Sequence, residues 1–340
     1  MKILKITLIN FLIFLFLTLV IEIIFGTWVK KNNFGISIRK LRNVEMPMSV
    51  KYNGKQYDYI FKRNNHGFIG DNLDPSKIQI VFLGGSTGEE MFKPPVYSIV
   101  GQLNSKFAKD GIDLKIINAS KGGKTTRGYV NDFRHWFSKI NNFNPRKFIF
   151  YIGINDSSLK IQGLFDKPYK NNLPEKIEDY IKNNSIIYLL KKKIENKYFN
   201  ELRKHYGLVK ENLYSNFQLI NYNKAREKFL KSELSDIEKN IIENFSKNLQ
   251  NLNNIIIEEE IEPIFITQIQ FDGINNKKLF IINEYLKEFC KINNYNIIKL
   301  DEMSYDLNHK DFYDEVHTTI EGSRKISSLI YKDIKKYLIE

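Results

Sequence analysis

Residues 78–88 read IQIVFLGGSTG, an apolar run followed by a turn rich in glycine. A short run of β-branched and aromatic residues is typical of a strand that is buried on both faces of a sheet. Glycine lets the chain leave such a strand in a sharp turn, so that a hydroxyl at Ser86 stands exposed with little crowding around it. Residues 78–88 therefore predict a buried strand that ends in an exposed serine.

Similar apolar runs alternate with helical patterns along the rest of the chain. The expected strands are 78–83, 114–118, 147–152, 263–269 and 296–300, and the expected helices lie near 97–109, 125–140, 275–293 and 318–338. This alternation predicts an α/β fold, namely a three-layer, flavodoxin-like parallel sheet of about five strands. In such folds the site lies at the carboxyl ends of the strands.

One connection is far longer than a usual crossover. About 100 residues, from Ser158 to about Glu262, join the third strand to the fourth and carry a helical pattern of apolar side chains. This helical insertion, at about 159–261, is either a cap over the site or a set of helices that covers the sheet edge. The expected organisation is a membrane anchor (1–28), a lead-in segment (29–75) and an α/β domain (76–340) that carries the insertion.

The N-terminus carries an apolar run that is long enough to cross a bilayer as a helix. Residues 6–25 are interrupted by few polar side chains, among them Glu22, and no small-x-small cleavage site follows them. Trp28, Lys30 and Lys31 suit the membrane interface at which such a helix ends. We therefore expect an uncleaved, single-pass N-terminal anchor. Basic residues are more numerous after the run than before it, which by itself favours a cytoplasmic domain.

Polar segments follow the first three expected strands, and a further polar segment lies near the C-terminus. They are residues 84–88 (GGSTG), 118–126 (NASKGGKTT), 153–156 (GIND) and 314–317 (DEVH). A serine together with an aspartate–histidine pair supplies the parts of a nucleophilic hydrolase, because the histidine can take the serine proton and the aspartate can orient the histidine. The sequence thus predicts one site built from all these segments.

Composition narrows the classes of partner and cofactor. The formal net charge is +13, but lysine is abundant along the whole chain, so no nucleic-acid partner is expected. Cys290 is the single cysteine, which excludes an intramolecular disulfide and a cysteine metal site. Asp311, Asp314 and His317 could bind a metal, but acid–base chemistry explains the last two more simply. We expect no metal and no cofactor.

Two other motifs share parts of this pattern. Residues 84–88 also match the nucleophile elbow of α/β-hydrolases, but there the serine lies mid-sheet, and the acid and the histidine come from separate loops. Residues 123–125 (GKT) suggest a phosphate-binding P-loop, but that motif needs a glycine where Asn118 stands. Both alternatives fit the sequence less well than the serine hydrolase.

The ordered polar segments resemble the SGNH hydrolase superfamily, the GDSL-type esterases and acetylhydrolases. The resemblance covers roughly residues 60–335 without the insertion. It implies that Ser86 is the nucleophile, that His317 is the general base and that Asp314 orients His317. The aspartate that commonly precedes the serine in the family is Gly85 here, as in a glycine-containing variant of the motif.

The same resemblance implies an oxyanion hole. Its donors would be the backbone N–H groups of Ser86 and Gly123 and the side-chain amide of Asn155, all aimed at the charge that develops on an ester carbonyl. Asp156, beside Asn155, would either belong to the site or support its loop. Residues 65–70 (NHGFIG) resemble a segment of membrane-anchored, glycan-associated members.

The resemblance implies a membrane-anchored serine esterase that removes O-acyl groups, acetyl above all, from a cell-surface carbohydrate. Its partners would be an acylated carbohydrate or a small ester, and the membrane. Because surface glycans lie outside the cell, residues 29–340 are expected on the extracytoplasmic side. Transfer of the acyl group to a sugar would make the protein an O-acyltransferase. A glycan-binding scaffold is the non-enzymatic alternative, and the intact set of site residues argues against it.

Overall fold

A parallel sheet of five strands forms the centre of the computed structural model, which describes residues 2–26, 28, 41–157, 173–203, 222–271 and 276–339. The strands, in chain order, are β3 (Ile80–Gly84), β4 (Ile116–Asn118), β5 (Lys147–Tyr151), β6 (Glu262–Ile266) and β7 (Asn296–Ile298). Their order in the sheet is β4-β3-β5-β6-β7, and all neighbours are parallel. This is the flavodoxin-like order, which confirms the predicted fold.

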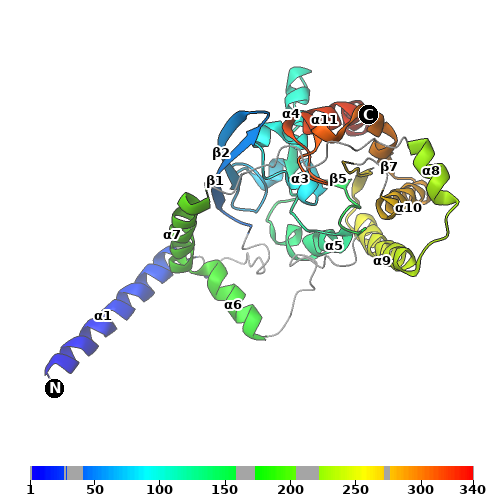
Figure 1. Cartoon of the computed structure of the whole chain (residues 1–340). Coiled ribbons are helices and arrows are strands. Elements are labelled where there is room, and N and C mark those ends of the chain that lie inside the picture. Colours follow the sequence, from blue (N-terminus) through cyan, green and yellow to red (C-terminus); the bar gives the residue numbers. More distant parts are fainter. Residues whose placement is uncertain are drawn as a thin grey trace.

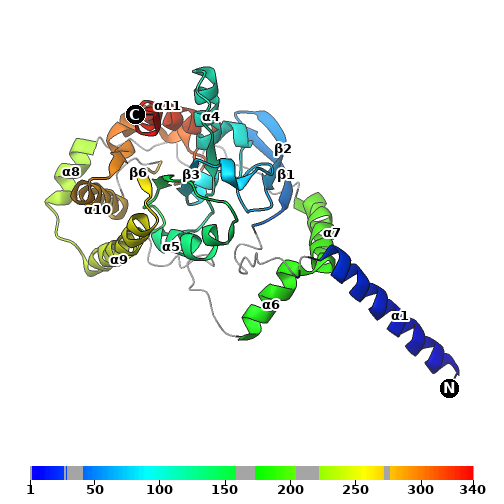
Figure 2. The ribbon, with the colours of Figure 1, turned by 180° about the vertical axis from the view of Figure 1, so that it is seen from behind.

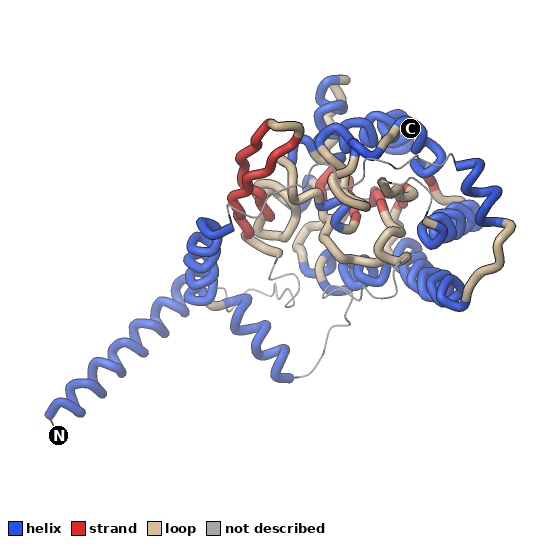
Figure 3. The backbone as a smooth tube through the Cα atoms, in the orientation of Figure 1, coloured by secondary structure: helices blue, strands red, loops and turns tan. Residues whose placement is uncertain are grey.

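Helices cover both faces of the sheet (Figures 1 and 3). One face packs against α5 (Thr126–His135), α9 (Asp236–Glu258) and α10 (Lys277–Asn293), and the other against α4 (Ile99–Lys109) and α11 (Ile320–Ile339). Side chains of one strand alternate between the two layers: Val81 and Leu83 face the first, whereas Ile80 and Phe82 face the second. Every residue of β3 is buried, as its continuous apolar run predicts.

A β-hairpin precedes the central sheet, within the lead-in segment. Its strands, β1 (Val44–Tyr52) and β2 (Lys55–Arg63), pair antiparallel through a two-residue turn. Asn53 and Gly54 in this turn have φ values of +48° and +77°, which asparagine and glycine adopt more readily than other residues. This hairpin was not predicted from the sequence, although an Asn-Gly turn is a strong signal for one.

Helices of the long connection lie in two different places. α9 is part of the core, where Phe245 and Leu249 pack with the sheet, and α8 (Tyr222–Leu230) packs on α10 through Phe229. By contrast, α6 (Leu173–Asn184) and α7 (Ile186–Arg203) extend away from the sheet, and α7 contacts β1 (Figure 2). The expected insertion also includes residues 159–172 and 204–221, which lie outside the described residues.

The N-terminal helix α1 (Lys2–Phe25) stands clear of the α/β domain (Figure 1). From Ile3 to Phe25 it is long and apolar enough to cross a membrane, and it is not buried against the rest of the chain. Its last turns contact α7. The remaining short elements are 3₁₀ turns at Pro75–Lys77, Pro95–Tyr97, Phe137–Lys139, Leu300–Asp306 and His309–Asp311.

Candidate active site

Ser86 is the first residue of the four-residue helix α3 (Ser86–Glu89), directly after β3. The turn before it depends on glycine at the points where the backbone passes close to other groups. A Cβ atom on Gly85 would lie 2.4 Å from Nδ2 of Asn155, and a Cβ atom on Gly88 would lie 2.7 Å from Oγ of Ser120. A side chain at either position would force the neighbouring group to shift, so the two glycines let Asn155 and Ser120, which follow two other strands, pack closely against this turn.

His317 and Asp314 form a hydrogen-bonded pair in the loop before α11. Nδ1 of His317 lies 2.7 Å from Oδ2 of Asp314, and Oδ1 of Asp314 accepts the backbone N–H groups of Val316 (2.9 Å) and His317 (2.7 Å). Burial would raise the pKa of Asp314, but these hydrogen bonds outweigh burial and hold the pKa below its usual value. Because the carboxylate can only accept, Nδ1 donates, and Nε2 is the nitrogen that is left to accept a proton.

A buried polar cluster connects the segment after α3 to the histidine loop. Glu90 accepts hydrogen bonds from Oγ1 of Thr318 (2.8 Å), Oγ of Ser323 (2.5 Å) and Nζ of Lys93 (2.8 Å). Lys93 in turn donates to the backbone oxygen of Thr318 and to Oγ of Ser323. Because Thr318 directly follows the histidine, this cluster fixes the histidine loop relative to the helix that begins at Ser86.

Within the described residues, Ser86 and His317 form no hydrogen bond with each other. Catalytic hydrogen bonds are often open in ligand-free sites and close around the substrate. The ring of Tyr313 stacks on the imidazole with a centroid distance of 5.6 Å and an interplanar angle of 10°, which limits the positions that the imidazole can take. Both Ser86 and His317 are half-buried and so remain accessible to a ligand.

The second polar segment, residues 118–126, also lies beside Ser86. A Cβ atom on Gly122 would lie 3.5 Å from Cβ of Ser86, so this loop runs beside the serine. Gly123 has a φ of +76°, a backbone conformation that favours glycine. The N–H group of Gly122 donates to Oε2 of Glu89, at 2.6 Å. The loop that carries Gly123 is therefore fixed to the end of α3.

A buried arginine from the hairpin also binds the end of α3 and the loop that follows β4. Arg63 on β2 donates to Oε1 of Glu89 at 2.7 Å and to the backbone oxygens of Gly67 and Ser120. Burial would raise the pKa of Glu89, but the charges of Arg63 and Lys121 outweigh burial, so the pKa lies below its usual value. Arg63, paired with Glu89, thus holds together the end of β2, the end of α3 and the loop that follows β4. Neither residue was predicted from the sequence, because a single charged residue far from its partner carries no sequence signal.

The third polar segment supplies Asn155. Nδ2 of Asn155 donates to the backbone oxygen of Lys124 at 2.7 Å and lies beside Gly85. A primary amide carries two N–H bonds, so one remains for a ligand oxygen. The neighbouring Asp156 accepts the backbone N–H (3.0 Å) and the hydroxyl (3.1 Å) of Thr126 at the start of α5, which is a loop-supporting position.

The residues of the alternative motifs have other contacts. Nζ of Lys124 is buried and bonds both carboxylate oxygens of Asp132, so the lysine of the P-loop-like run points into the core. Asp311 accepts Nζ of Lys325 at 2.9 Å. In the part of the chain that the structure describes, no three His, Cys, Asp or Glu side chains are grouped to hold a metal ion.

No protein-family model and no curated protein sequence matches the chain. Solved structures with a similar fold include TesA, at 9% identity and a TM-score of 0.45 over 76% of this chain and 99% of that chain. They also include the acetyl xylan esterase AlAXEase (15% identity, TM-score 0.43, 76% of this chain and 100% of that chain) and a member of the lipolytic protein G-D-S-L family from Veillonella parvula (12%, 0.43, 76% and 99%).

In fold, the chain is similar to TesA, to an acetyl xylan esterase and to a member of the lipolytic protein G-D-S-L family. This similarity concerns the fold alone, because the identities are 15% or lower and the TM-scores are 0.45 or lower. Evidence on the activity therefore comes from the side chains of this chain.

Proposed function

We propose that the chain is a serine ester hydrolase with Ser86 as nucleophile, His317 as general base and Asp314 as the residue that orients the base. The observation that carries this proposal is the Asp314–His317 hydrogen bond, because it leaves Nε2 of the imidazole to accept a proton. The buried cluster around Glu90 supports it, since that cluster connects the histidine loop to the segment that follows Ser86.

The proposed reaction has two steps. In the first, Ser86 Oγ forms a bond to the ester carbonyl carbon while Nε2 of His317 takes the hydroxyl proton. The tetrahedral intermediate then expels the alcohol, which receives that proton from His317, and the acyl group stays on Ser86. In the second step, His317 takes a proton from water, the water oxygen attacks the acyl-serine, and the carboxylic acid leaves as the serine regains its proton.

The oxyanion hole is part of the same proposal. The N–H group of Ser86 belongs to the first turn of α3, where backbone N–H groups have no partner within the helix. The N–H group of Gly123 and the second N–H of the Asn155 amide are the other two donors. Preorganised donors of this kind stabilise the transition state more than the substrate, because the negative charge develops only there.

The proposed substrate is an O-acylated carbohydrate, with acetyl as the acyl group and the α/β domain on the extracytoplasmic side of the membrane. Support comes from the resemblance of the polar segments to SGNH esterases and from the membrane-length helix α1. The test is to incubate the purified full-length chain with an acetylated sugar and with a short-chain ester, and to measure free acetate and acetylated acceptor together. Free acetate alone identifies a hydrolase, whereas acetyl transfer identifies the O-acyltransferase, and the absence of both products rejects an acyl-ester enzyme.

Asp314→Asn tests the role of the aspartate. Asparagine can donate to Nδ1 and so favours the wrong imidazole tautomer; kcat/KM is expected to fall by roughly 10²–10⁴-fold. Since the folded chain holds the pKa of Asp314 below its usual value, the carboxylate stabilises the fold above about pH 4, and this contribution is lost as the pH falls through the folded pKa. Ester turnover and thermal unfolding against pH measure both effects, and unchanged turnover would remove Asp314 from the mechanism.

Gly85→Ala tests the position of Asn155. The new Cβ atom would lie 2.4 Å from Nδ2 of Asn155, so the amide has to move away from the oxyanion hole. We expect kcat/KM to fall by roughly 10²–10³-fold, the usual cost of one lost donor. The melting temperature should change little, because the new Cβ atom meets the far end of the half-buried Asn155 side chain and not the backbone.

A double-mutant cycle gives the control for this substitution. Asn155→Ala should cause a similar loss, and the double variant with Gly85→Ala should be no worse than either single variant, because both remove the same donor. Additive losses would show that Gly85 affects catalysis by some other route.

A further inference from the structure

The apolar helix α1 ends in a polar junction with α7. Glu22 is the only acidic residue of α1, and its carboxylate accepts the backbone N–H groups of Ile186 (3.1 Å) and Ile187 (3.2 Å) and the hydroxyl of Ser185 (2.5 Å). These groups form the N-terminus of α7, where N–H groups lack partners within the helix and the helix dipole favours negative charge. The junction therefore explains why an otherwise apolar helix contains a glutamate.

The C-terminal part of α6 is attached to the same junction. The hydroxyl of Tyr180 donates to the backbone oxygen of Trp28 at 2.7 Å, and the two rings lie 5.8 Å apart. Nε1 of Trp28 in turn donates to the backbone oxygen of Glu22 at 3.0 Å. Figures 1 and 2 show that α6 and α7 meet α1 at its C-terminal end and that α6 leads away from it.

The composition of α1 locates this junction relative to a bilayer. The candidate span begins at Ile3, and the 19 residues from Ile3 to Ile21, before Glu22, carry Lys5 as their one charged side chain. At ~1.5 Å per residue they span roughly 28 Å, close to the ~30 Å hydrocarbon core. Glu22 and Trp28 then lie at the boundary between lipid and water, where tryptophan is favoured. A bilayer that α1 spans must consequently reach the start of α7 and the end of α6.

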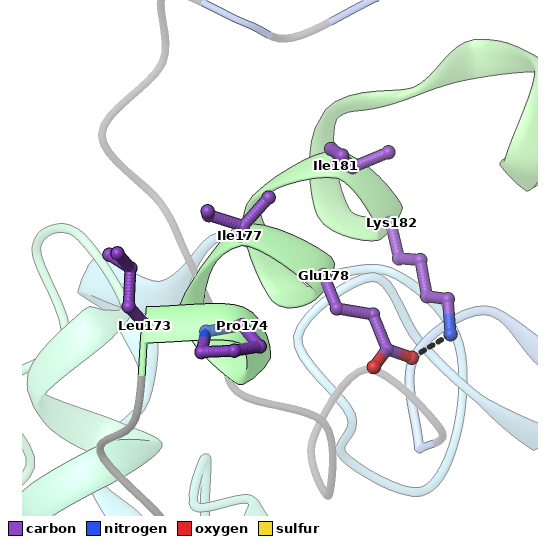
Figure 4. A pocket seen from close by; sticks show the side chains of 6 residues that line it. All are labelled: Leu173, Pro174, Ile177, Glu178, Ile181 and Lys182. Carbon is purple, nitrogen blue, oxygen red and sulfur yellow. Dashed lines mark hydrogen bonds and ion pairs between the residues drawn. The ribbon is translucent and has the colours of Figure 1, made fainter.

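α6 carries an exposed apolar stripe beside this boundary. Leu173, Ile177 and Ile181 follow one another at intervals of four residues, so they share one face of the helix, and they are 69%, 51% and 47% exposed. With Pro174 they line a shallow pocket of about 550 Å³ (Figure 4). Glu178 and Lys182, which also border the pocket, form an ion pair along its edge. An amphipathic helix of a water-soluble domain would bury such a stripe in its core.

We propose that α6 lies in the membrane interface, with Leu173, Ile177 and Ile181 inserted between lipid headgroups and the upper acyl chains. The occupant of the stripe is then the bilayer itself, because the contacts of Tyr180 and Glu22 hold α6 at the end of α1. α1 then spans the bilayer and α6 lies in its interface, and the two attachments together fix the orientation of the α/β domain above the membrane. This inference rests on the proposed membrane span of α1 and does not depend on the proposed esterase activity.

The test uses the full-length chain in vesicles of neutral and anionic phospholipid. Ile177→Cys carries an environment-sensitive fluorophore, and Glu178→Cys, the adjacent position on the polar edge of the stripe, is the matched control. The native Cys290 is buried, and the unsubstituted chain measures its background labelling. Quenching is measured with a nitroxide on the lipid acyl chain and with aqueous iodide, and thermal unfolding checks that each labelled chain is folded.

The expected result is strong lipid quenching and at least several-fold lower iodide quenching at position 177 than at position 178. Equal iodide quenching at both positions, without lipid quenching, would place α6 in water and overturn the proposal. Shielding from iodide without lipid quenching would also overturn it, because the stripe would then be covered by protein. A third label, at Phe14→Cys, must be quenched by a nitroxide deep in the bilayer. If it is not quenched, the premise that α1 spans the membrane is overturned. Ester turnover of the same samples tests the proposed enzyme activity separately.

Discussion

Ser86→Ala is expected to abolish ester turnover, with a loss of kcat/KM on the order of 10⁴-fold or more. The substitution removes the only proposed nucleophile, so no acyl-enzyme can form, and reaction with a serine-directed phosphonate should disappear as well. The fold should persist, because Ser86 is half-buried and the change removes a single oxygen atom. Ester kinetics, phosphonate labelling followed by mass spectrometry, and thermal unfolding measure these outcomes.

Two further variants sharpen this test. His317→Ala should lose nearly as much activity, and the double variant with Ser86→Ala should be no worse, because members of a catalytic unit act together. Ser120→Ala is the matched control: its Oγ lies beside the same turn but is buried without a hydrogen-bond partner among the described residues. Full labelling of the Ser86→Ala chain, or loss of labelling in the Ser120→Ala chain, would assign the nucleophile elsewhere.

Lys93→Met is expected to cause the largest loss of stability, about 3–5 kcal/mol in the free energy of unfolding. The Lys93 side chain is 1% exposed, and its removal leaves the buried carboxylate of Glu90 without its counter-charge. Burial lowers the pKa of Lys93, while the nearby Glu90 opposes this shift and favours the charged amine. Urea unfolding measures the loss.

The controls for this prediction compare buried with exposed charge. Replacing both partners, Lys93→Met with Glu90→Leu, should recover much of the stability, because no unpaired charge stays in the interior. Lys335→Met removes a surface partner of Asp110 and should cost less than ~1 kcal/mol. If Lys93→Met lowers the free energy of unfolding by no more than Lys335→Met does, the buried cluster around Glu90 does not hold the histidine loop in place.

The sheet was predictable because its strands are continuous apolar runs, which are recognisable one at a time. β3 and β5 carry such runs, and both predicted strands lie within two residues of the observed bounds. The hairpin was missed for the opposite reason: β1 and β2 mix polar with apolar residues, since a two-stranded sheet beside the core buries only some of its side chains, among them Val50 and Phe61. Only the Asn53-Gly54 turn marked it.

The contact between Asp314 and His317 was predictable because its geometry is local. Asp314 and His317 are three residues apart, so one loop sets their hydrogen bond, and the pair can be read from the sequence. The supporting contacts are not local. Glu90 and Thr318 are 228 positions apart, and nothing in the sequence around either residue specifies the other. Only the fold brings them together.

Because Glu90 and Thr318 are far apart in the sequence, the ribosome also adds them at different times. During synthesis α1 leaves the ribosome before Glu90, and Thr318 is added 228 residues after Glu90. At about 5–20 residues per second, roughly 10–45 s pass between Glu90 and its partner. Until then the carboxylate has no hydroxyl from the histidine loop to bind, and that loop does not yet exist. In the proposed mechanism the nascent chain therefore lacks its general base while the N-terminal helix is already free to enter a membrane.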